Sequence, residues 1–254
     1  MTPNSKPAGT VACRQMRNEN RHRRRGHDVI ALSRASGQDV TTGKGLVEAM
    51  AGADAVIDVS SQMTMNTEKA VSFFTDATRN LLAAERTAGV GHHVALSIVG
   101  IDGLDTGYNA GKLAQERLVS ESEVPWTLQR ATQFHEFAGQ ALAQGTIGPV
   151  ALVPKMLLRP VAAREVAERL LDLAEAGPAG RVQDFVGPRD ETLLGMVRKT
   201  FAHDGIKRRP ISAVLPGKYW RAARGGALRG TDDSVTGRLT FDQWLQSPDR
   251  ELSK

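Results

Sequence analysis

The sequence predicts an α/β fold built on a doubly wound parallel sheet. From Gly26 onward, short β-branched runs alternate with amphipathic helical stretches, which is the pattern of repeated βα units. The chain has 254 residues, of which 41% are hydrophobic, so it can bury the core of one large domain. We expect residues 24–254 to form this domain, with a small C-terminal substrate lobe from about residue 133. Residues 1–23 are expected to be a basic segment that is disordered or replaced.

The first half of the domain shows the clearest alternation. The helix expected over Thr67–Ala88 has a 3.6-residue apolar period, and Gly89 ends it. Around this helix, the apolar runs predict strands at 28–32, 55–59, 93–99 and 126–130, and helices at 46–51 and 108–120. Because helices separate successive strands, the strands are expected to run in parallel.

The second half is less regular. A helix over Ala163–Ala176 is closed by Gly177 and Pro178, residues that end helices. Beyond it we expect strands at 182–186 and 211–215, a helix at 192–202 and a helical turn at Phe241–Leu245. A Gly/Arg-rich loop is expected over 221–230.

The net charge of +5 is concentrated at the N-terminus. The first 26 residues carry seven basic side chains against Glu19, which leaves 26 basic and 27 acidic side chains in the rest of the chain. The folded body is therefore nearly neutral, and nucleic acid is not the expected partner. The Arg-rich terminus itself could be a solvated arm, a nucleic-acid contact or a targeting peptide.

Cysteine and hydropathy also limit the class of protein. Cys13 is the single cysteine, so no internal disulfide forms, and no zinc-ligand spacing occurs; we expect no metal. No stretch reaches the roughly 18 apolar residues of a membrane helix. We expect a cytoplasmic protein that acts on a small molecule, while its oligomeric state stays open.

Tyr108 and Lys112 form a YxxxK pair, one helical turn apart and eleven residues after Ser97. Residues four apart share a helix face, so a phenol and an ammonium there can act on one bound molecule. A free phenol has a pKa of about 10, and a neighbouring ammonium favours the phenolate. We therefore expect Lys112 to lower the pKa of Tyr108, and Ser97, at a strand end, to hydrogen-bond the same substrate oxygen.

This arrangement resembles the short-chain dehydrogenase/reductase superfamily, and further segments resemble its atypical, NmrA-like branch. The segments are residues 25–29 (RGHDV), 80–85 (NLLAAE), 93–97 (HVALS), 112–116 (KLAQE), 130–134 (RATQF) and 159–162 (RPVA). The resemblance implies a Rossmann-like domain that binds NAD(P). It also implies Tyr108 as the proton donor or acceptor, Lys112 on the nicotinamide ribose and Ser97 as the group that polarises a carbonyl.

The cofactor contacts are expected at the carboxyl ends of the strands. Arg34 ends the first expected strand, where an Arg accommodates a 2′-phosphate and an acidic residue would bind ribose hydroxyls. NADP is therefore expected, with NAD possible, and Ser33 and Ser60 are further candidate contacts. The usual glycine-rich turn would fall on residues 9–14, where only Gly9 and Thr10 match it. The first strand and its turn are thus degraded or absent, through replacement or as a degraded phosphate loop.

The substrate side is expected in the loop after Arg130. Its polar and aromatic residues suit a small organic substrate, although the aromatic ones could equally pack the core; the candidates are Thr132, Gln133, Phe134 and His135. Two functions stay open. One is an NAD(P)-dependent oxidoreductase that transfers hydride to or from a small carbonyl or quinone-like compound. The other is a non-catalytic NAD(P)-binding regulator, or an inactive homologue with impaired cofactor binding.

Overall fold

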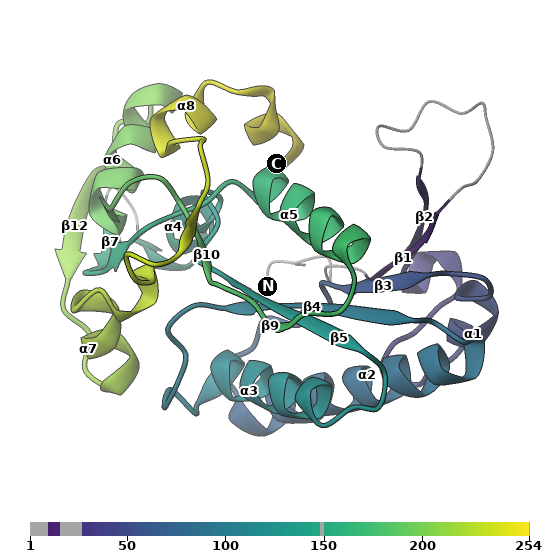
Figure 1. The fold of residues 1–254 in the computed structure, drawn as a ribbon. Coiled ribbons are helices and arrows are strands. Elements are labelled where there is room, and N and C mark those ends of the chain that lie inside the picture. The colour runs from purple at the N-terminus through teal and green to yellow at the C-terminus, as the bar shows by residue number, and fades with distance from the viewer. Residues whose placement is uncertain (1–9, 16–26, 148–149, 254) are drawn as a thin grey trace. The chain divides into compact units, whose positions relative to one another are not determined.

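A computed structural model describes residues 10–15, 27–147 and 150–253 (Figure 1). The chain divides into two compact units. Unit 1 comprises Met1–Ser97, Asp102–Gln129 and Leu170–Val182, and unit 2 comprises Ile98–Ile101, Arg130–Arg169 and Gln183–Lys254. The candidate phenol and ammonium both belong to unit 1, whereas the expected substrate loop belongs to unit 2.

Unit 1 is an α/β unit with the expected central sheet. Its strands are β1 (Thr10–Gln15), β2 (His27–Leu32), β3 (Ala55–Asp58), β4 (His92–Ile98), β5 (Trp126–Ala131) and β9 (Gly180–Arg181), in the order β2-β1-β3-β4-β5 with β9 on β5. β3 is parallel to β4, and β9 is parallel to β5. All four residues of β3 are buried, as expected for a central strand covered on both faces.

The helices of unit 1 cover this sheet and fix its core. They are α1 (Leu46–Ala49), α2 (Thr67–Ala88), α3 (Gly107–Ser120) and the short 3₁₀ helix η1 (Arg34–Ser36). α2 and α3 lie side by side on one face of the sheet (Figure 1). α2 begins where the Asn66 side chain accepts the Lys69 N–H at 2.8 Å, and it ends at Gly89, whose φ is 74°. The expected bounds of α2 are thereby confirmed.

The first strand differs from the sequence-based expectation. Thr10–Gln15 occupies the central position between β2 and β3, and it is antiparallel to both neighbours. Residues 1–23 were expected to be disordered or replaced, with the first strand degraded or absent. A strand nevertheless forms at Thr10–Gln15, because Thr and Val favour extended backbone and both neighbouring strands offer backbone groups for pairing. Gly9 lies outside the described residues, and Thr10 lies in the strand rather than in a turn.

The reversed direction of β1 determines which edge of the sheet it leads to. Thr10 pairs with Leu32 and Asp58, the last residues of β2 and β3, while Gln15 pairs with His27, the first residue of β2. β1 therefore starts at the carboxyl edge of its neighbours and ends at their amino edge. In a Rossmann-like sheet the first strand runs the other way and leads into the phosphate-binding turn.

Unit 2 combines short strands with helices. β10 (Phe185–Val186) is parallel both to the end of β5, at Ala131, and to β13 (Val235–Thr236). The other strands are β6 (Thr146–Ile147), β7 (Val150–Pro154) and β12 (Arg209–Ala213), which form one sheet in the order β12-β7-β6, and β8 (Leu157–Leu158) with β11 (Glu191–Thr192). The helices are α4 (Phe137–Gly145), α6 (Leu193–Asp204), α7 (Lys218–Arg224), α8 (Phe241–Leu245), η2 (Ala227–Arg229) and η3 (Pro248–Ser253), and α5 (Ala163–Ala176) contributes residues to both units.

Several details of this half depart from expectation. The expected strand at 182–186 is reduced to the two residues of β10, and β12 lies two residues earlier than predicted. α4 was not predicted, and α7 begins before the segment that was expected to be a loop. Each of these elements is short, and short elements carry too few residues for a clear periodicity. α5 and α8 have the expected bounds.

Candidate functional site

The carboxyl edge of unit 1 carries two buried hydroxyls. Ser60 follows β3 and Ser97 lies near the end of β4, with 2% and 3% of their surfaces exposed. Neither hydroxyl oxygen has a hydrogen-bond partner among the described residues. A buried hydroxyl without a partner costs about 1–3 kcal/mol, so a bound polar ligand would remove this cost. Their position at the carboxyl ends of adjacent parallel strands is where a doubly wound sheet takes its ligands.

Tyr108 lies in the first turn of α3. The Gly107 N–H donates to Thr67 Oγ1 at 2.8 Å, which ties the start of α3 to the start of α2. The Tyr108 hydroxyl is 2.7 Å from Ser61 Oγ, and its ring packs edge-on against Phe74 with centroids 5.4 Å apart. Burial raises the pKa of the Tyr108 phenol, and the hydrogen bond to Ser61 opposes this effect. The phenol is therefore protonated at neutral pH.

Lys112 lies one turn further along α3 and is almost fully buried. Its Nζ donates to the Leu96 carbonyl at 2.9 Å and to Gln115 Oε1 at 2.8 Å, and it lies 4.6 Å from the centre of the Phe74 ring. The Gln115 side chain in turn donates to Asp58 Oδ2 at 2.7 Å. Burial lowers the pKa of Lys112 to about 8, although the charge of Asp58 acts in the opposite direction.

These contacts correct one expectation. Lys112 was predicted to lower the pKa of Tyr108, but the pKa of this phenol is raised and its hydroxyl bonds to Ser61. The physical reason is that a long, flexible side chain can turn toward the sheet, where a carbonyl and an amide oxygen accept its protons. Sharing a helix face with Tyr108 did not decide which groups Lys112 contacts.

The predicted ribose contacts lie at the end of β2. Ser33 forms a capping box with Ser36 at the start of η1, in which each side chain accepts the backbone N–H of the other residue. Arg34 is the first residue of η1 and is exposed. It thus lies at the strand end where the fold binds the adenosine ribose.

The expected substrate residues after Arg130 belong to unit 2 and make contacts within it. Thr132 Oγ1 donates to the Arg159 carbonyl at 2.6 Å. The backbone carbonyl of Gln133 accepts the Val161 N–H at 3.0 Å, and Phe134 forms a β-bridge to the same residue. The His135 N–H donates to the Val161 carbonyl at 3.1 Å, so all four residues contact the 159–161 segment through their own backbone or side-chain groups.

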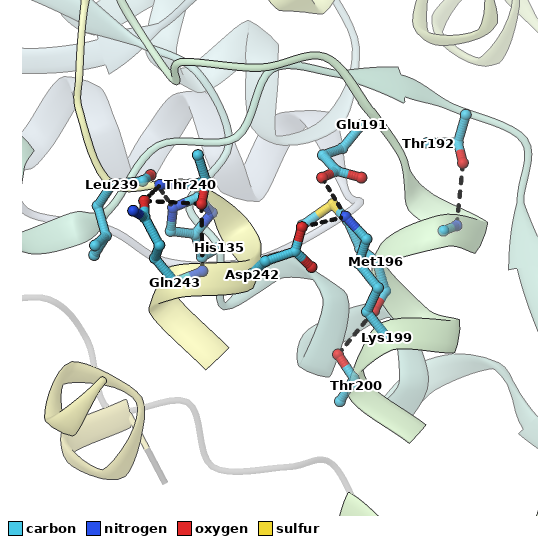
Figure 2. A network of polar contacts seen from close by, with 11 residues as sticks. His135, Glu191, Thr192, Met196, Lys199, Thr200, Leu239, Thr240, Asp242 and Gln243 are labelled. Atoms are coloured by element: carbon cyan, nitrogen blue, oxygen red, sulfur yellow. Dashed lines mark hydrogen bonds and ion pairs between the residues drawn. The ribbon is translucent and has the colours of Figure 1, made fainter. Parts of the chain in front are cut away.

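His135 is fully buried against α8 and the residues before it (Figure 2). Its Nε2 donates to the Leu239 carbonyl at 3.0 Å, and its ring lies 5.6 Å from that of Phe241 and 5.5 Å from that of Trp244. Burial lowers the pKa of His135 to about 4. The imidazole is therefore neutral at physiological pH, which suits a packing role better than a proton relay.

Sequence reasoning missed Ser61, Gln115 and Phe74 as neighbours of the candidate pair. Ser61 follows Ser60 directly, and Gln115 follows Lys112 by three residues, a spacing that places both on one face of α3. Phe74 lies on α2 and contacts both Tyr108 and Lys112. Sequence spacing could have indicated Ser61 and Gln115. It could not have indicated Phe74, because that contact depends on how two helices pack.

A comparison with profiles of protein families shows which family the chain belongs to. The profile of a family described as NAD(P)H-binding matches residues 16–174, which is more than half of the chain. The chain belongs to this NAD(P)H-binding family. The expected NAD(P)-binding relationship is thus confirmed, and the matched segment begins just after β1. No curated protein matches the chain.

Solved structures agree on the fold. An NADPH-dependent quinone oxidoreductase from Escherichia coli, solved with NADPH, is 18% identical with a TM-score of 0.60, and the match covers 82% of this chain and 81% of that one. A triphenylmethane reductase from Citrobacter, solved with NADP(H), is 17% identical with a TM-score of 0.60 and the same coverages. A nucleoside-diphosphate-sugar epimerase from Staphylococcus aureus is 13% identical with a TM-score of 0.59, covering 83% and 82%. The expected Rossmann-like α/β fold is confirmed.

The described residues include polar groups that suit the ribose and nicotinamide half of a dinucleotide. The unpartnered hydroxyls of Ser60 and Ser97 suit a ribose or a carboxamide at the carboxyl edge. The pyrophosphate half normally binds at a glycine-rich turn that follows the first strand. Because β1 ends at Gln15, beside the amino end of β2, it does not lead into a turn at that edge. The unpartnered hydroxyls thus fit the ribose and nicotinamide half of the cofactor, whereas β1 does not lead into the usual pyrophosphate-binding turn.

The described residues carry neither a membrane-spanning helix nor a cluster of metal ligands. No helix there is both long and apolar enough to cross a membrane. Nor do three or more His, Cys, Asp or Glu side chains in that part of the chain gather as metal ligands.

Proposed function

We propose that this protein is an NAD(P)-dependent oxidoreductase that transfers hydride to or from a small carbonyl or quinone-like compound. The observation that supports this most is the Tyr108 phenol, which is only partly buried and lies 2.7 Å from a second hydroxyl on Ser61. Both lie in the unit that carries the unpartnered hydroxyls of Ser60 and Ser97. A protonated phenol with a hydrogen-bonded partner is a suitable general acid.

The phenol supplies the proton of the reduction. When the cofactor is bound, NAD(P)H provides a hydride, that is, two electrons and a proton, to the carbonyl carbon. Tyr108 donates its proton to the carbonyl oxygen, and the product is an alcohol. The tyrosinate that remains accepts a hydrogen bond from Ser61 and regains a proton from water. Since burial raises the pKa of Tyr108, reduction starts from the protonated form that is present at neutral pH.

Lys112 would hold the nicotinamide ribose only after a change of partners. In this structure its ammonium donates to the Leu96 carbonyl and to Gln115, and it lies over the Phe74 ring. Rotation about the flexible side chain would bring the ammonium toward a ribose hydroxyl at the same edge.

NADP is the proposed dinucleotide, and Arg34 the residue that selects it. Arg34 is exposed at the end of β2, so it can pair with a 2′-phosphate without losing a buried contact. Replacement by alanine is expected to weaken NADPH binding about tenfold and to leave NADH binding unchanged, as measured by calorimetry. Equal loss for both cofactors would show that Arg34 does not contact the 2′-phosphate.

Turnover of NADPH with a panel of carbonyls and quinones tests the function itself. Tyr108→Phe removes the acid but keeps the ring, and we expect kcat to fall by about 100-fold or more with NADPH binding retained. Full turnover in the Phe variant would contradict the assignment of Tyr108. NADPH binding without turnover on any compound would favour the regulator.

A further inference from the structure

The segment from Ser61 to Met65 links the phenol to an exposed apolar surface. It follows β3 and leads into α2, whose first turn begins after Asn66. Ser61 is partly exposed and bonds to the Tyr108 hydroxyl, whereas Met63 and Met65 are 56% and 81% exposed. Met65, Val214 and Met63 are the three most exposed large apolar side chains among the described residues, and two of the three lie on this short segment.

Backbone contacts hold this segment beside Tyr108. A Cβ placed on Gly107, the residue before Tyr108, would lie 3.3 Å from the Met65 carbonyl oxygen. The backbone at Met65 is therefore packed against the start of α3. Thr64 Oγ1 accepts the Asn66 N–H at 3.2 Å, which fixes the turn into α2. Both methionines are thus attached to a backbone that is held close to the phenol.

Ser61 and Ser97 differ in the accessibility of their hydroxyl groups, and a contact with substrate requires an accessible hydroxyl. The Ser97 hydroxyl is fully buried and contacts no described polar group, while the Ser61 hydroxyl is already bonded to the acid and is partly open. A substrate oxygen that takes the proton of Tyr108 also comes within reach of Ser61. The role that the sequence suggested for Ser97, polarisation of the carbonyl, therefore suits Ser61 better.

The composition of the segment indicates the class of substrate. Residues 59–66 read Val-Ser-Ser-Gln-Met-Thr-Met-Asn and contain no charged side chain. A nucleotide-sugar brings a diphosphate, which is normally met by Arg, Lys or a helix N-terminus. Methionine side chains are flexible and polarizable, and they make favourable contacts with aromatic rings. This composition suits a planar apolar carbonyl better than a charged sugar nucleotide.

We propose that residues 61–65 form the substrate face of the Tyr108 site, with Ser61 hydrogen-bonding the reacting oxygen and Met63 and Met65 contacting a planar, apolar carbonyl substrate such as a quinone. The proposal rests on the proposed function, which names the acid, and it adds the residues that bind and select the substrate. Ser61 is a catalytic residue in this account because it touches the reacting atom. The two methionines determine specificity.

The hydrogen bond to Ser61 can be tested without turnover. The chain has two tyrosines, so in a Tyr219→Phe background the absorbance of tyrosinate reports the ionisation of Tyr108 alone. Ser61→Ala is expected to raise the pKa of Tyr108, because it removes a donor to the phenolate. Ser120→Ala, which removes an exposed hydroxyl at the far end of α3, is the matched control and should leave the titration unchanged. An unchanged titration in Ser61→Ala would overturn the role of Ser61.

Substrate class is tested by isotope labelling of the methionine methyl groups. The chain has seven methionines, and Met63→Leu and Met65→Leu variants assign the two resonances. With NADP⁺ present, which cannot reduce the quinone, 1,4-naphthoquinone is expected to shift both resonances, whereas UDP-glucose should shift neither. Shifts with UDP-glucose alone, or shifts at other methionines only, would overturn the proposal.

Kinetics then separate this proposal from the proposed function. Ser61→Ala should lower kcat with naphthoquinone by about 100-fold, and Ser61→Thr, which restores a hydroxyl, should recover most of it. The double variant Met63→Ser/Met65→Ser should raise KM by about tenfold with little change in kcat. If Tyr108→Phe abolishes turnover but these variants behave as wild type, only the substrate face is wrong. If quinone shifts the methyl groups without any turnover, the oxidoreductase assignment fails and the binding face stands.

Discussion

Tyr108 and Lys112 lie one turn apart on the same helix, yet the phenol is partly exposed and the ammonium is buried. The phenol hydroxyl lies 2.7 Å from the hydroxyl of Ser61 on a surface segment. The ammonium is 4% exposed and is held by the Leu96 carbonyl and by Gln115, which connects it to Asp58. The difference shows that the spacing of a motif fixes the face of a helix, while side-chain length and burial fix what each group contacts.

The largest expected effect is the loss of the buried ammonium. Lys112→Ala removes the donor to the Leu96 carbonyl and to Gln115, and it leaves the charge of Asp58 without its nearby cation. We expect the free energy of unfolding to fall by about 3–5 kcal/mol in urea titrations. Lys69→Ala, an exposed lysine on α2, should change it by no more than about 0.5 kcal/mol. A loss below about 1 kcal/mol at Lys112 would mean that its contacts are dispensable, and the contrast with Tyr108 would disappear.

The second-largest expected effect is a change of the free energy of unfolding with pH, which the burial of Lys112 causes. Lys112 has a pKa of about 8 in the folded protein and 10.5 as the ordinary value. Between these pH values the unfolded chain keeps a proton that the folded protein has lost, so the folded state gains stability as pH rises. Since one pKa unit corresponds to about 1.4 kcal/mol, wild type should gain roughly 3 kcal/mol relative to Lys112→Met across this range. A constant difference between the two proteins from about pH 8 to pH 10 would contradict the burial of this charge.

The third effect concerns the helix contact that brings Phe74 to both groups. A Cβ on Gly111 would lie 2.4 Å from Phe74 Cδ2 and 2.7 Å from the Ala70 carbonyl oxygen. Gly111→Ala is therefore expected to cost about 1–3 kcal/mol, because α2 or the ring must shift. Gly139→Ala is the matched control, since its Cβ would meet nothing within 4 Å on helix α4. If Gly111→Ala lowered the free energy of unfolding no more than Gly139→Ala does, the two helices would have room to separate. Phe74 would then not be fixed between Tyr108 and Lys112.

The sequence predicted the long helices because their periodicity spans several turns. α2 and α5 have the expected bounds, and the parallel strands β3 and β4 lie where apolar runs placed them. The direction of β1 could not be predicted, because a run of six residues has the same alternation whichever way it runs. Direction depends on which neighbours are available for pairing, which is a property of the assembled sheet.

The places of the candidate residues in the fold could be predicted from the sequence, and their contacts could not. Ser60, Ser97, Tyr108 and Lys112 all lie in unit 1, as their positions at strand ends and on α3 suggested. Sequence spacing carries no information on the rotamer of a long side chain, so the turn of Lys112 toward Leu96 was missed. The residue that bonds to the phenol, Ser61, lies 47 positions away from it and becomes a neighbour only through the packing of the segment before α2.

The smallest expected effect is on the stability of the Tyr108→Phe variant. The phenylalanine ring keeps the edge-on contact with Phe74, and Ser61 is exposed enough to bond to water in place of the lost hydroxyl. The free energy of unfolding should therefore change by less than about 1 kcal/mol, in contrast to Lys112→Ala. Urea unfolding of the two variants under one condition measures the contrast directly. A loss above about 2 kcal/mol in Tyr108→Phe would make the phenol a structural contact like the ammonium, because only a hydroxyl whose partner cannot reach water costs that much to remove.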